Sequence, residues 1–403
     1  MKKHLNVLSY LFSAKKETTK KKNWMLIVVT ISIVFPFASC QKETTNSGKD
    51  TNSTQTNKNA ATTHEASFKV FATGLNNPRG LKFGPDGNLY VAEAGLGGTN
   101  STIGICTQVV FPVGPYTGSA TGGRISKITP DGVRSTVTDQ LPSSQANEII
   151  GGDVEGVADI EFVGNNLYAL LAGGGCSHGV PSVPNGIVKV NSNGGWSMVT
   201  DLSNWLQSHP PASPAIQDFE PDGTWYSMIN VRGDLYALEP NTQQIVRVDP
   251  ATGTTSLVID LSKTYPGTTE WFGPTAIAYH GNFFIGNLDQ FPIEGGASQI
   301  LKMTPDATTK AWETGLNTVL GLVFDNKDRM YVLEMTVGAP FPTPGLGRIV
   351  RIDPGGSRTV IATGLNLPTG MAMGPDGKLY VSNWGFGPPP IGLGEIVQID
   401  VTN

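Results

Sequence analysis

The sequence predicts an all-β fold, a six-bladed β-propeller closed by an N-terminal outer strand. One strand pattern occurs six times along the chain, and 49 Gly and 28 Pro among 403 residues favour short strands joined by turns. No segment shows helical periodicity beyond about two turns, and residues 201–207 give the best helical pattern, a single turn within a loop. Because repeat folds do not follow the usual relation of length to domain number, the repeat decides the interpretation.

The repeat is centred on an apolar strand with an aromatic residue in the middle. Its copies are residues 89–91, 167–169, 235–237, 283–285, 330–332 and 379–381. Each precedes a second strand with an apolar–x–basic–apolar pattern, in which Gln398 replaces the basic residue of the last copy. The central aromatic residues are spaced by 78, 68, 48, 47 and 49 residues. The last three spacings match one four-stranded blade, and the first two include insertions.

Turn residues and the chain ends complete the fold prediction. Gly84-Pro85-Asp86-Gly87 has the composition of a tight turn between two strands. The chain finishes after a third strand at Ile399, whereas residues 67–73 form a lone outer-type strand. We expect this strand to complete the sixth blade, which would cover two sheet edges. A β-sandwich or a β-helix is the alternative, and six units of four strands fit both less well.

The first 39 residues predict a lipoprotein signal peptide. Lys20 to Lys22 are followed by an apolar run of 14 residues, 24–37, which is too short to span a bilayer comfortably. The run ends in Phe37-Ala38-Ser39-Cys40, which resembles a bacterial lipobox with Cys40 as the lipidated residue. The alternative is an ordinary signal peptide that happens to contain a cysteine.

Residues 40–66 are predicted to be a disordered tether because they are almost entirely polar or small. Gln41 directly after the lipid site favours the outer membrane, so we expect an envelope lipoprotein that faces the periplasm or the cell surface. The membrane is then a partner through the lipid anchor. Residues 67–403 form the propeller, which we expect to be a monomer.

The distribution of charge argues against nucleic acid as a partner. Seven Lys and one Glu give residues 1–39 a net charge of +6. Because the whole chain has a net charge of −5, residues 40–403 carry a net charge of −11. An acidic folded domain repels the phosphate backbone, and no basic stripe with interleaved aromatic residues is present in the sequence.

Polar residues recur three positions after the central aromatic residues, where the strands reach the mouth of the axial channel. They are Glu93, Glu239, Asn287, Glu334 and Asn383, with Leu171 as the exception. Arg79 and Asp159 belong to the same region, and Thr275 and Thr369 add hydroxyl groups. Such an oxygen-rich set suits Ca²⁺ or Mg²⁺. The interpretation that we favour is that these strand ends meet water in the channel, with a metal site or a metal-free ligand site as the alternatives.

The loops on the same face contain Phe-Pro pairs at Phe111, Phe291 and Phe341, together with Phe386. Such residues form either an apolar binding rim or plugs between blades. Cys106 and Cys176 fall in the loops of the first two blades, and we predict a disulfide between them. His178 lies beside Cys176 and is expected to be a solvated loop residue. The sequence contains no nucleophile elbow, P-loop or His-Glu-x-x-His motif.

Several of these segments resemble the ScyD/ScyE family, named for proteins associated with the biosynthesis of a cyanobacterial sunscreen pigment. The matching segments cover the whole folded region and are residues 71–75, 78–81, 83–87, 89–95, 159–160, 331–334 and 380–383. The resemblance implies a six-bladed, NHL-like propeller of unsettled biochemical role. The motif Gly-Pro-Asp-Gly-x-Leu-Tyr also occurs in NHL-repeat and gluconolactonase-like propellers.

Two classes of function follow. The first is a lipid-anchored envelope protein without defined catalytic activity, whose propeller binds a ligand or protein partner through its loop-rich face. The alternative is a metal-dependent hydrolase or lactonase of the gluconolactonase-like type. It would use Glu93, Glu239, Glu334, Asn287 and Asn383 at the channel mouth.

Overall fold

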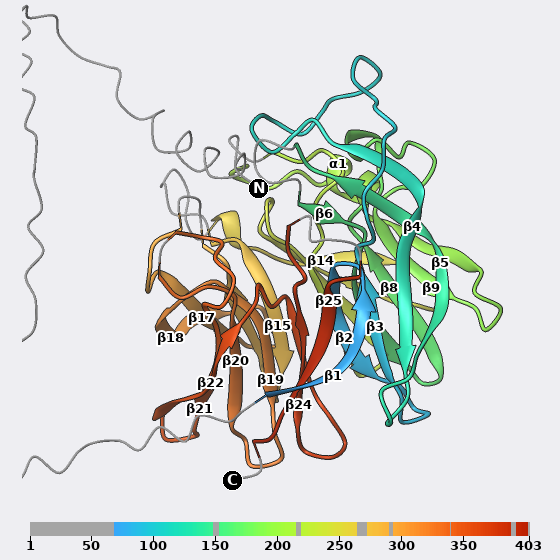
Figure 1. Cartoon of the computed structure of the whole chain (residues 1–403). Helices are drawn as coiled ribbons and strands as arrows, with labels where there is room; N and C mark the ends of the chain where they lie inside the picture. Colours follow the sequence, from blue (N-terminus) through green and yellow to red (C-terminus); the bar gives the residue numbers. More distant parts are fainter. Residues whose placement is uncertain are drawn as a thin grey trace, which may run out of the picture. The chain divides into compact units, whose positions relative to one another are not determined.

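The computed structural model describes residues 68–147, 153–214, 219–263, 272–289, 293–338, 340–387 and 392–401. Cys40, the predicted signal peptide and the predicted tether lie outside the described residues, and so does Phe291. Within the described part of the chain, six antiparallel sheets form the blades of a β-propeller, as the sequence predicts (Figure 1). None of the helices in this part is long and apolar enough to cross a membrane.

Four blades are meanders of four strands taken in chain order. The second consists of β7 (Val157–Val163), β8 (Asn166–Leu171), β9 (Gly186–Val190) and β10 (Trp196–Asp201). The third consists of β11 (Ser227–Val231), β12 (Asp234–Glu239), β13 (Gln244–Val248) and β14 (Thr255–Asp260). The fourth consists of β15 (Pro274–Tyr279), β16 (Phe283–Asn287), β17 (Ser298–Met303) and β18 (Thr309–Leu316). The fifth consists of β19 (Val319–Phe324), β20 (Met330–Glu334), β21 (Gly347–Ile352) and β22 (Arg358–Leu365).

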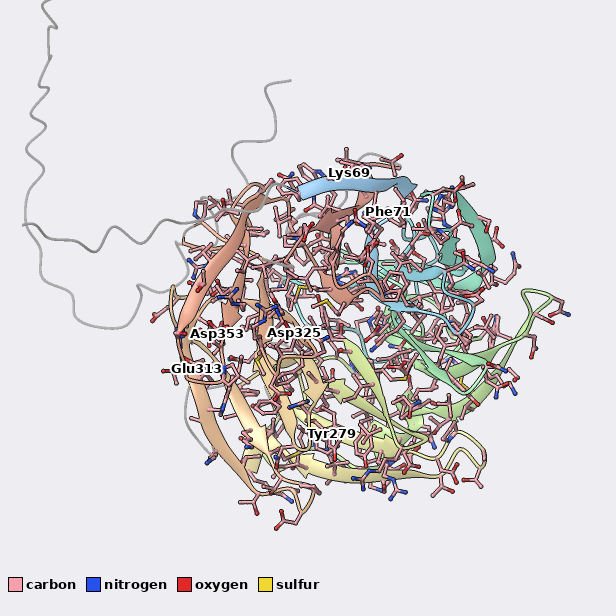
Figure 2. All side chains as sticks on the ribbon, turned by 90° about the horizontal axis from the view of Figure 1, so that it is seen from below. Lys69, Phe71, Tyr279, Glu313, Asp325 and Asp353 are labelled. Carbon is pink, nitrogen blue, oxygen red and sulfur yellow. A yellow bond between two sulfur atoms is a disulfide. The ribbon has the colours of Figure 1, made fainter. Side chains whose placement is uncertain are left out.

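The sixth blade joins the two ends of the folded chain. Its strands are β23 (Gly370–Met373), β24 (Leu379–Asn383), β25 (Gly394–Ile399) and the N-terminal β1 (Phe68–Leu75). β1 pairs antiparallel with β25, with Phe68 opposite Ile399 and Leu75 opposite Gly394. Figure 2 shows β1, marked by Lys69 and Phe71, beside the C-terminal strands at the edge of the ring. The predicted closure of the ring by this strand is confirmed.

The first blade differs from the short meander that the sequence predicts. It contains β2 (Pro78–Phe83), β3 (Leu89–Glu93), β4 (Thr117–Ile128), β5 (Arg134–Gln145) and β6 (Val154–Glu155). β4 and β5 have 12 residues each, and β6 adds a fifth strand by pairing with the far end of β5. A four-stranded blade of ordinary length would need only the first few residues of β5. Part of the insertion between Tyr90 and Tyr168 therefore forms the longer β4–β5 hairpin.

The repeated turn and the repeated tyrosine form one structural unit. The Tyr90 hydroxyl donates to the Asp86 carboxylate at 3.0 Å, and the Tyr380 hydroxyl donates to Asp376 at 3.1 Å. The Tyr90 ring also packs edge-on against Phe162 of the next blade, with ring centroids 5.0 Å apart. The tyrosine therefore ties its own turn and fills the space between blades, which explains why the motif recurs.

Short helices lie in the loops of the described residues, among them the 3₁₀ helix η4 (Leu261–Lys263) after β14. α1 (Leu202–Ser208) begins at Asp201, whose carboxylate accepts from the backbone N–H of Asn204 at 2.8 Å. This helix matches the helical pattern predicted for residues 201–207. The 3₁₀ helix η2 (Cys176–His178) follows β8 and carries a residue of the site described next.

Candidate metal centre and adjoining cavity

A cavity of about 160 Å³ lies where the inner strands begin. Tyr226 lines it and also lines a second cavity of about 260 Å³, which runs along the inner strands. The Tyr226 hydroxyl donates to the backbone oxygen of Thr369, in the sixth blade, at 3.2 Å. Tyr226 therefore lies between the two cavities.

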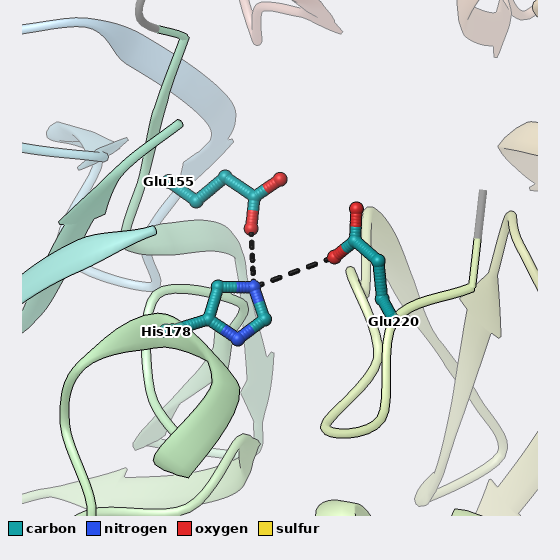
Figure 3. Close-up of side chains that lie close together, drawn as sticks. All are labelled: Glu155, His178 and Glu220. Atoms are coloured by element: carbon teal, nitrogen blue, oxygen red, sulfur yellow. Dashed lines mark hydrogen bonds and ion pairs between the residues drawn. The ribbon is translucent and has the colours of Figure 1, made fainter. Parts of the chain in front are cut away.

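Three ionisable side chains from different segments meet at one side of the first cavity. Glu155 ends β6, His178 ends η2, and Glu220 lies in the segment before β11. His178 Nε2 is 3.0 Å from Glu155 Oε2 and 3.4 Å from Glu220 Oε2 (Figure 3). All three ligand atoms lie within 4.8 Å of one another, and no other such group of three occurs among the described residues.

The position of His178 is set by contacts between the loops of the first two blades. A disulfide joins Cys176 at the start of η2 to Cys106 of the first blade, with Cα atoms 6.3 Å apart. This is the pairing that the sequence predicts. Thr102 Oγ1 donates to the backbone oxygen of Cys176. A Cβ on Gly118 would lie 2.2 Å from the backbone oxygen of His178, so only glycine allows β4 this close to η2.

Glu155 is held by side chains that direct one of its oxygens toward His178. Its Oε1 atom accepts from the Tyr116 hydroxyl at 3.1 Å and from Thr224 Oγ1 at 2.7 Å. The Oε2 atom is left to face His178. On the other side of His178, Ser177 is fixed by Asp222, which accepts from the Ser177 backbone N–H at 2.7 Å. The group is therefore pre-organised by neighbours from three blades.

The electrostatics of this group depend on burial and on the two carboxylates. The His178 side chain is fully buried, which by itself would lower its pKa, but the hydrogen bonds to Glu155 and Glu220 outweigh burial and raise the pKa to about 10. Without a metal, His178 therefore carries a proton near neutral pH. The expectation of a solvated loop histidine is wrong, because η2 packs under the first blade.

The distances within the group suit a divalent cation. A metal ion about 2.1 Å from each ligand atom holds two ligands about 3.0 Å apart at a right angle and about 3.4 Å apart at a tetrahedral angle. The observed separations of 3.0 and 3.4 Å match these values. The same two separations also suit the ion pairs of a protonated His178, so a cation bound by all three atoms would take the place of that proton.

A second charged pair lines the same cavity. Arg79 Nη2 donates to Asp153 Oδ1 at 3.1 Å and to the backbone oxygen of Val154. Burial raises the pKa of Asp153 to about 6, although the neighbouring Arg79 acts in the opposite direction. Arg79 thus lines the same cavity as Glu155.

The five residues predicted as metal ligands are occupied by hydrogen bonds close to their own blades. Three of them accept from a backbone N–H in the turn that enters the blade: Glu93 from Asn76 at 2.7 Å, Glu334 from Asn317 at 2.6 Å and Asn383 from Asn366 at 2.7 Å. Glu239 accepts from Thr224 at 2.9 Å, and Asn287 accepts from Gln299 at 2.6 Å. Glu93 and Glu334 also pair with Arg124 and Arg348. The glutamates among the five form no ligand group in the described part of the chain.

Asp159 lies deeper than the predicted position at the mouth. It lines the second cavity, and its carboxylate accepts from the backbone N–H of Met228 at 2.8 Å. Thr275 Oγ1 donates to the backbone oxygen of Val319 at 2.6 Å, and Thr369 Oγ1 donates to that of Pro78 at 2.6 Å. These side chains join the inner strands of neighbouring blades, so they stabilise the ring.

The described loop phenylalanines fall into two groups, those that line the cavity and one that is exposed. Phe341 and Phe386 line the cavity, with ring centroids 6.3 Å apart. Phe111 is 69% exposed and takes no part in the cavity lining.

Comparisons with known proteins found similar solved structures but no family for this chain. No protein-family model and no curated sequence matches the chain. A gluconolactonase from Xanthomonas campestris is similar in structure, at 10% identity and a TM-score of 0.49, over 85% of this chain and 92% of that one. The calcium-binding protein regucalcin from Agrobacterium tumefaciens is 12% identical, with a TM-score of 0.49 over 83% of this chain and 95% of that one. A virginiamycin B lyase from Staphylococcus aureus is 9% identical, with a TM-score of 0.44 over 84% of this chain and 99% of that one.

Proposed function

We propose that this chain is a metal-dependent hydrolase that cleaves a small ester or lactone in the cavity beside Glu155, His178 and Glu220. One observation carries the proposal: ligand atoms of Glu155 and of the buried His178 and Glu220 lie within 4.8 Å of one another next to a cavity. Three protein ligands leave coordination positions open, as in catalytic metal sites. This proposal takes up the hydrolase alternative and places the metal on different residues.

The composition of the group favours particular metals. Imidazole is a good ligand for Zn²⁺, whereas carboxylates suit Mn²⁺, Mg²⁺ and Ca²⁺. One imidazole with two carboxylates therefore favours Zn²⁺ or Mn²⁺ over the Ca²⁺ or Mg²⁺ that the oxygen-rich ring predicts. A bound cation would supply Lewis acidity toward a carbonyl group and a more acidic water.

The chain's own residues would bind and orient the substrate. Arg79 is held by Asp153 and Val154 at the cavity wall, where its guanidinium can donate to a substrate oxygen. Asp153 lines the same cavity, and its pKa of about 6 suits a group that accepts a proton near neutral pH. The surrounding apolar side chains exclude bulk water and strengthen these interactions.

Hydrolysis by metal-loaded protein tests the proposal. Purified protein is stripped with EDTA, supplied separately with Zn²⁺, Mn²⁺, Mg²⁺ or Ca²⁺, and assayed with a panel of phenyl esters and lactones. We expect hydrolysis only after Zn²⁺ or Mn²⁺ is added, and loss of it in Glu220→Gln. The matched control is His280→Gln, because His280 forms a 3.0 Å pair with Asp328 on the outer surface. Absence of metal-dependent hydrolysis across the panel would leave the ligand-binding propeller as the better interpretation.

We also propose attachment to the outer membrane through a lipid on Cys40. Support comes from the signal-like segment and the cysteine that ends it. Mass spectrometry of the mature N-terminus is expected to show a diacylglyceryl cysteine, absent in Cys40→Ser. An unmodified cysteine in the wild-type chain contradicts this.

A further inference from the structure

The charged side chains of the cavity beside the candidate metal centre all lie on one side. The first three blades contribute Arg79, Asp153, Glu155, Glu220 and Thr224, together with apolar residues such as Val113, Trp225 and Pro240. The last three blades contribute Leu288, Leu320, Met335, Phe341 and Phe386. Thr275 also belongs to these blades, but its hydroxyl is used by the backbone of Val319.

The apolar wall is a continuous packed surface. Leu320, Met335 and Leu367 form one buried cluster, against which Phe341, Phe386 and Tyr226 pack. A hydroxyl group placed against this wall would lose its hydrogen bonds to water without gaining a partner. The wall therefore disfavours a polyhydroxylated ring and favours hydrocarbon.

The volume limits the size of what fits. A cavity of 160 Å³ is close to the size at which an apolar protein cavity holds benzene. One six-membered ring fits, with a small polar group reaching the Glu155 side. A fused two-ring system is larger than this volume, so its second ring would extend beyond the cavity.

We infer that the substrate is an ester or lactone with a compact apolar group of about the size of a benzene ring. This group packs against Leu320, Met335 and Phe341, and the carbonyl group faces Glu155 and Glu220. The identity of the reacting group rests on the proposed function. The preference for the apolar group rests on the cavity wall alone.

Binding of stable amides to EDTA-treated protein tests the preference separately from metal and hydrolysis. The probes are acetamide, benzamide, 1-naphthamide and the sugar ring 1,5-anhydroglucitol, measured by isothermal titration calorimetry. Each buried methylene tightens binding by roughly fourfold, so we expect benzamide to bind at least about tenfold tighter than acetamide. 1-Naphthamide is expected to bind no more tightly than benzamide, because its second ring extends beyond the cavity, and 1,5-anhydroglucitol no more tightly than acetamide. Equal affinities for the four probes, or tightest binding of the sugar ring, overturn the inference.

A matched pair of variants locates the binding. Phe341→Ser removes part of the wall, whereas Phe111→Ser changes a phenylalanine that also precedes a proline but is exposed. We expect benzamide to bind about fivefold or more weaker to Phe341→Ser, with acetamide unaffected and Phe111→Ser like the wild type. Equal effects of the two variants contradict the assignment. If Phe341→Ser does not fold, Leu288→Asn replaces it, since Leu288 is only partly buried.

Discussion

The last three blades and the first three blades use the same strand pattern for different purposes. In the fourth to sixth blades, the aromatic residues follow one another at 47 and 49 residues, and the side chains that these blades contribute to the cavity are mostly apolar. In the first two blades, spacings of 78 and 68 residues leave room for the extended β4–β5 hairpin, β6 and η2. Glu155 and His178 lie on these added segments, and Glu220 lies in the connection to the third blade.

This difference separates the residues that hold the ring together from those that form the candidate site. Side chains at the repeated positions stabilise the turns that enter the blades. Glu93, Glu334 and Asn383, for example, each accept a hydrogen bond from a backbone N–H in such a turn. The added segments are supported by contacts that occur once, such as the disulfide between Cys106 and Cys176. Changes in the two groups should therefore have different consequences for stability and metal binding.

Removal of β1 should have the largest effect. A chain that begins at residue 76 leaves the edge of β25 unpaired and removes the buried Leu75 from the closing blade. We expect this chain to be insoluble on expression, while a chain that begins at residue 67 folds normally. Sedimentation and circular dichroism of the two chains provide the measurement. An equally stable shorter chain contradicts closure by β1.

Loss of the disulfide should affect both stability and the metal centre. The bridge closes a loop with a sequence separation of 70, and by chain-entropy arguments its removal costs about 4 kcal/mol. The double variant Cys106→Ser, Cys176→Ser should also bind metal at least about tenfold more weakly, because η2 loses its support. Urea denaturation and metal titration measure the two effects. Unchanged metal affinity would show that the bridge does not position His178.

Stability of the metal-free protein should depend on pH through His178. Its pKa is about 10 in the folded chain against 6.5 in the unfolded chain, so the folded state holds the proton more tightly. The resulting stability is fully present below pH 6.5 and is lost as the pH rises to about 10, with a change on the order of 2–4 kcal/mol. Urea denaturation in EDTA between pH 6 and 10 measures it. His178→Gln should flatten the profile, and a constant difference between the two proteins contradicts the assignment.

A substitution in the repeated unit should have the smallest effect on stability and should leave the candidate metal centre unchanged. Tyr380→Phe removes the 3.1 Å hydrogen bond to Asp376, at a cost of about 1 kcal/mol. Thermal denaturation measures the loss, and metal titration should give the wild-type affinity. Weakened metal binding would mean that the regular blades and the added segments are energetically coupled.

The repeat explains how much could be predicted from the sequence. The strands, the turns and the pairing of β1 with β25 follow from alternation and spacing, which every blade must satisfy. The same repetition produced the set of polar residues predicted at the channel mouth. Glu93, Glu334 and Asn383 recur because each accepts from a backbone N–H located 17 residues earlier in the entering turn.

The candidate ligands could not be found in this way. Glu155, His178 and Glu220 occur once each, and no fixed spacing relates them. The available signal was the position of His178 two residues after a cysteine predicted to form a disulfide, since a bridged loop is held in place. Their convergence depends on how the longer hairpin folds over η2, which local sequence patterns do not specify.

Anomalous diffraction from crystals of the Mn²⁺- or Zn²⁺-loaded protein tests the central claim most directly. The account predicts one strong peak per chain, about 2.0–2.3 Å from Glu155 Oε2, His178 Nε2 and Glu220 Oε2. A peak among Glu93, Glu239 and Glu334, or no peak beside His178 at saturating metal, would contradict it.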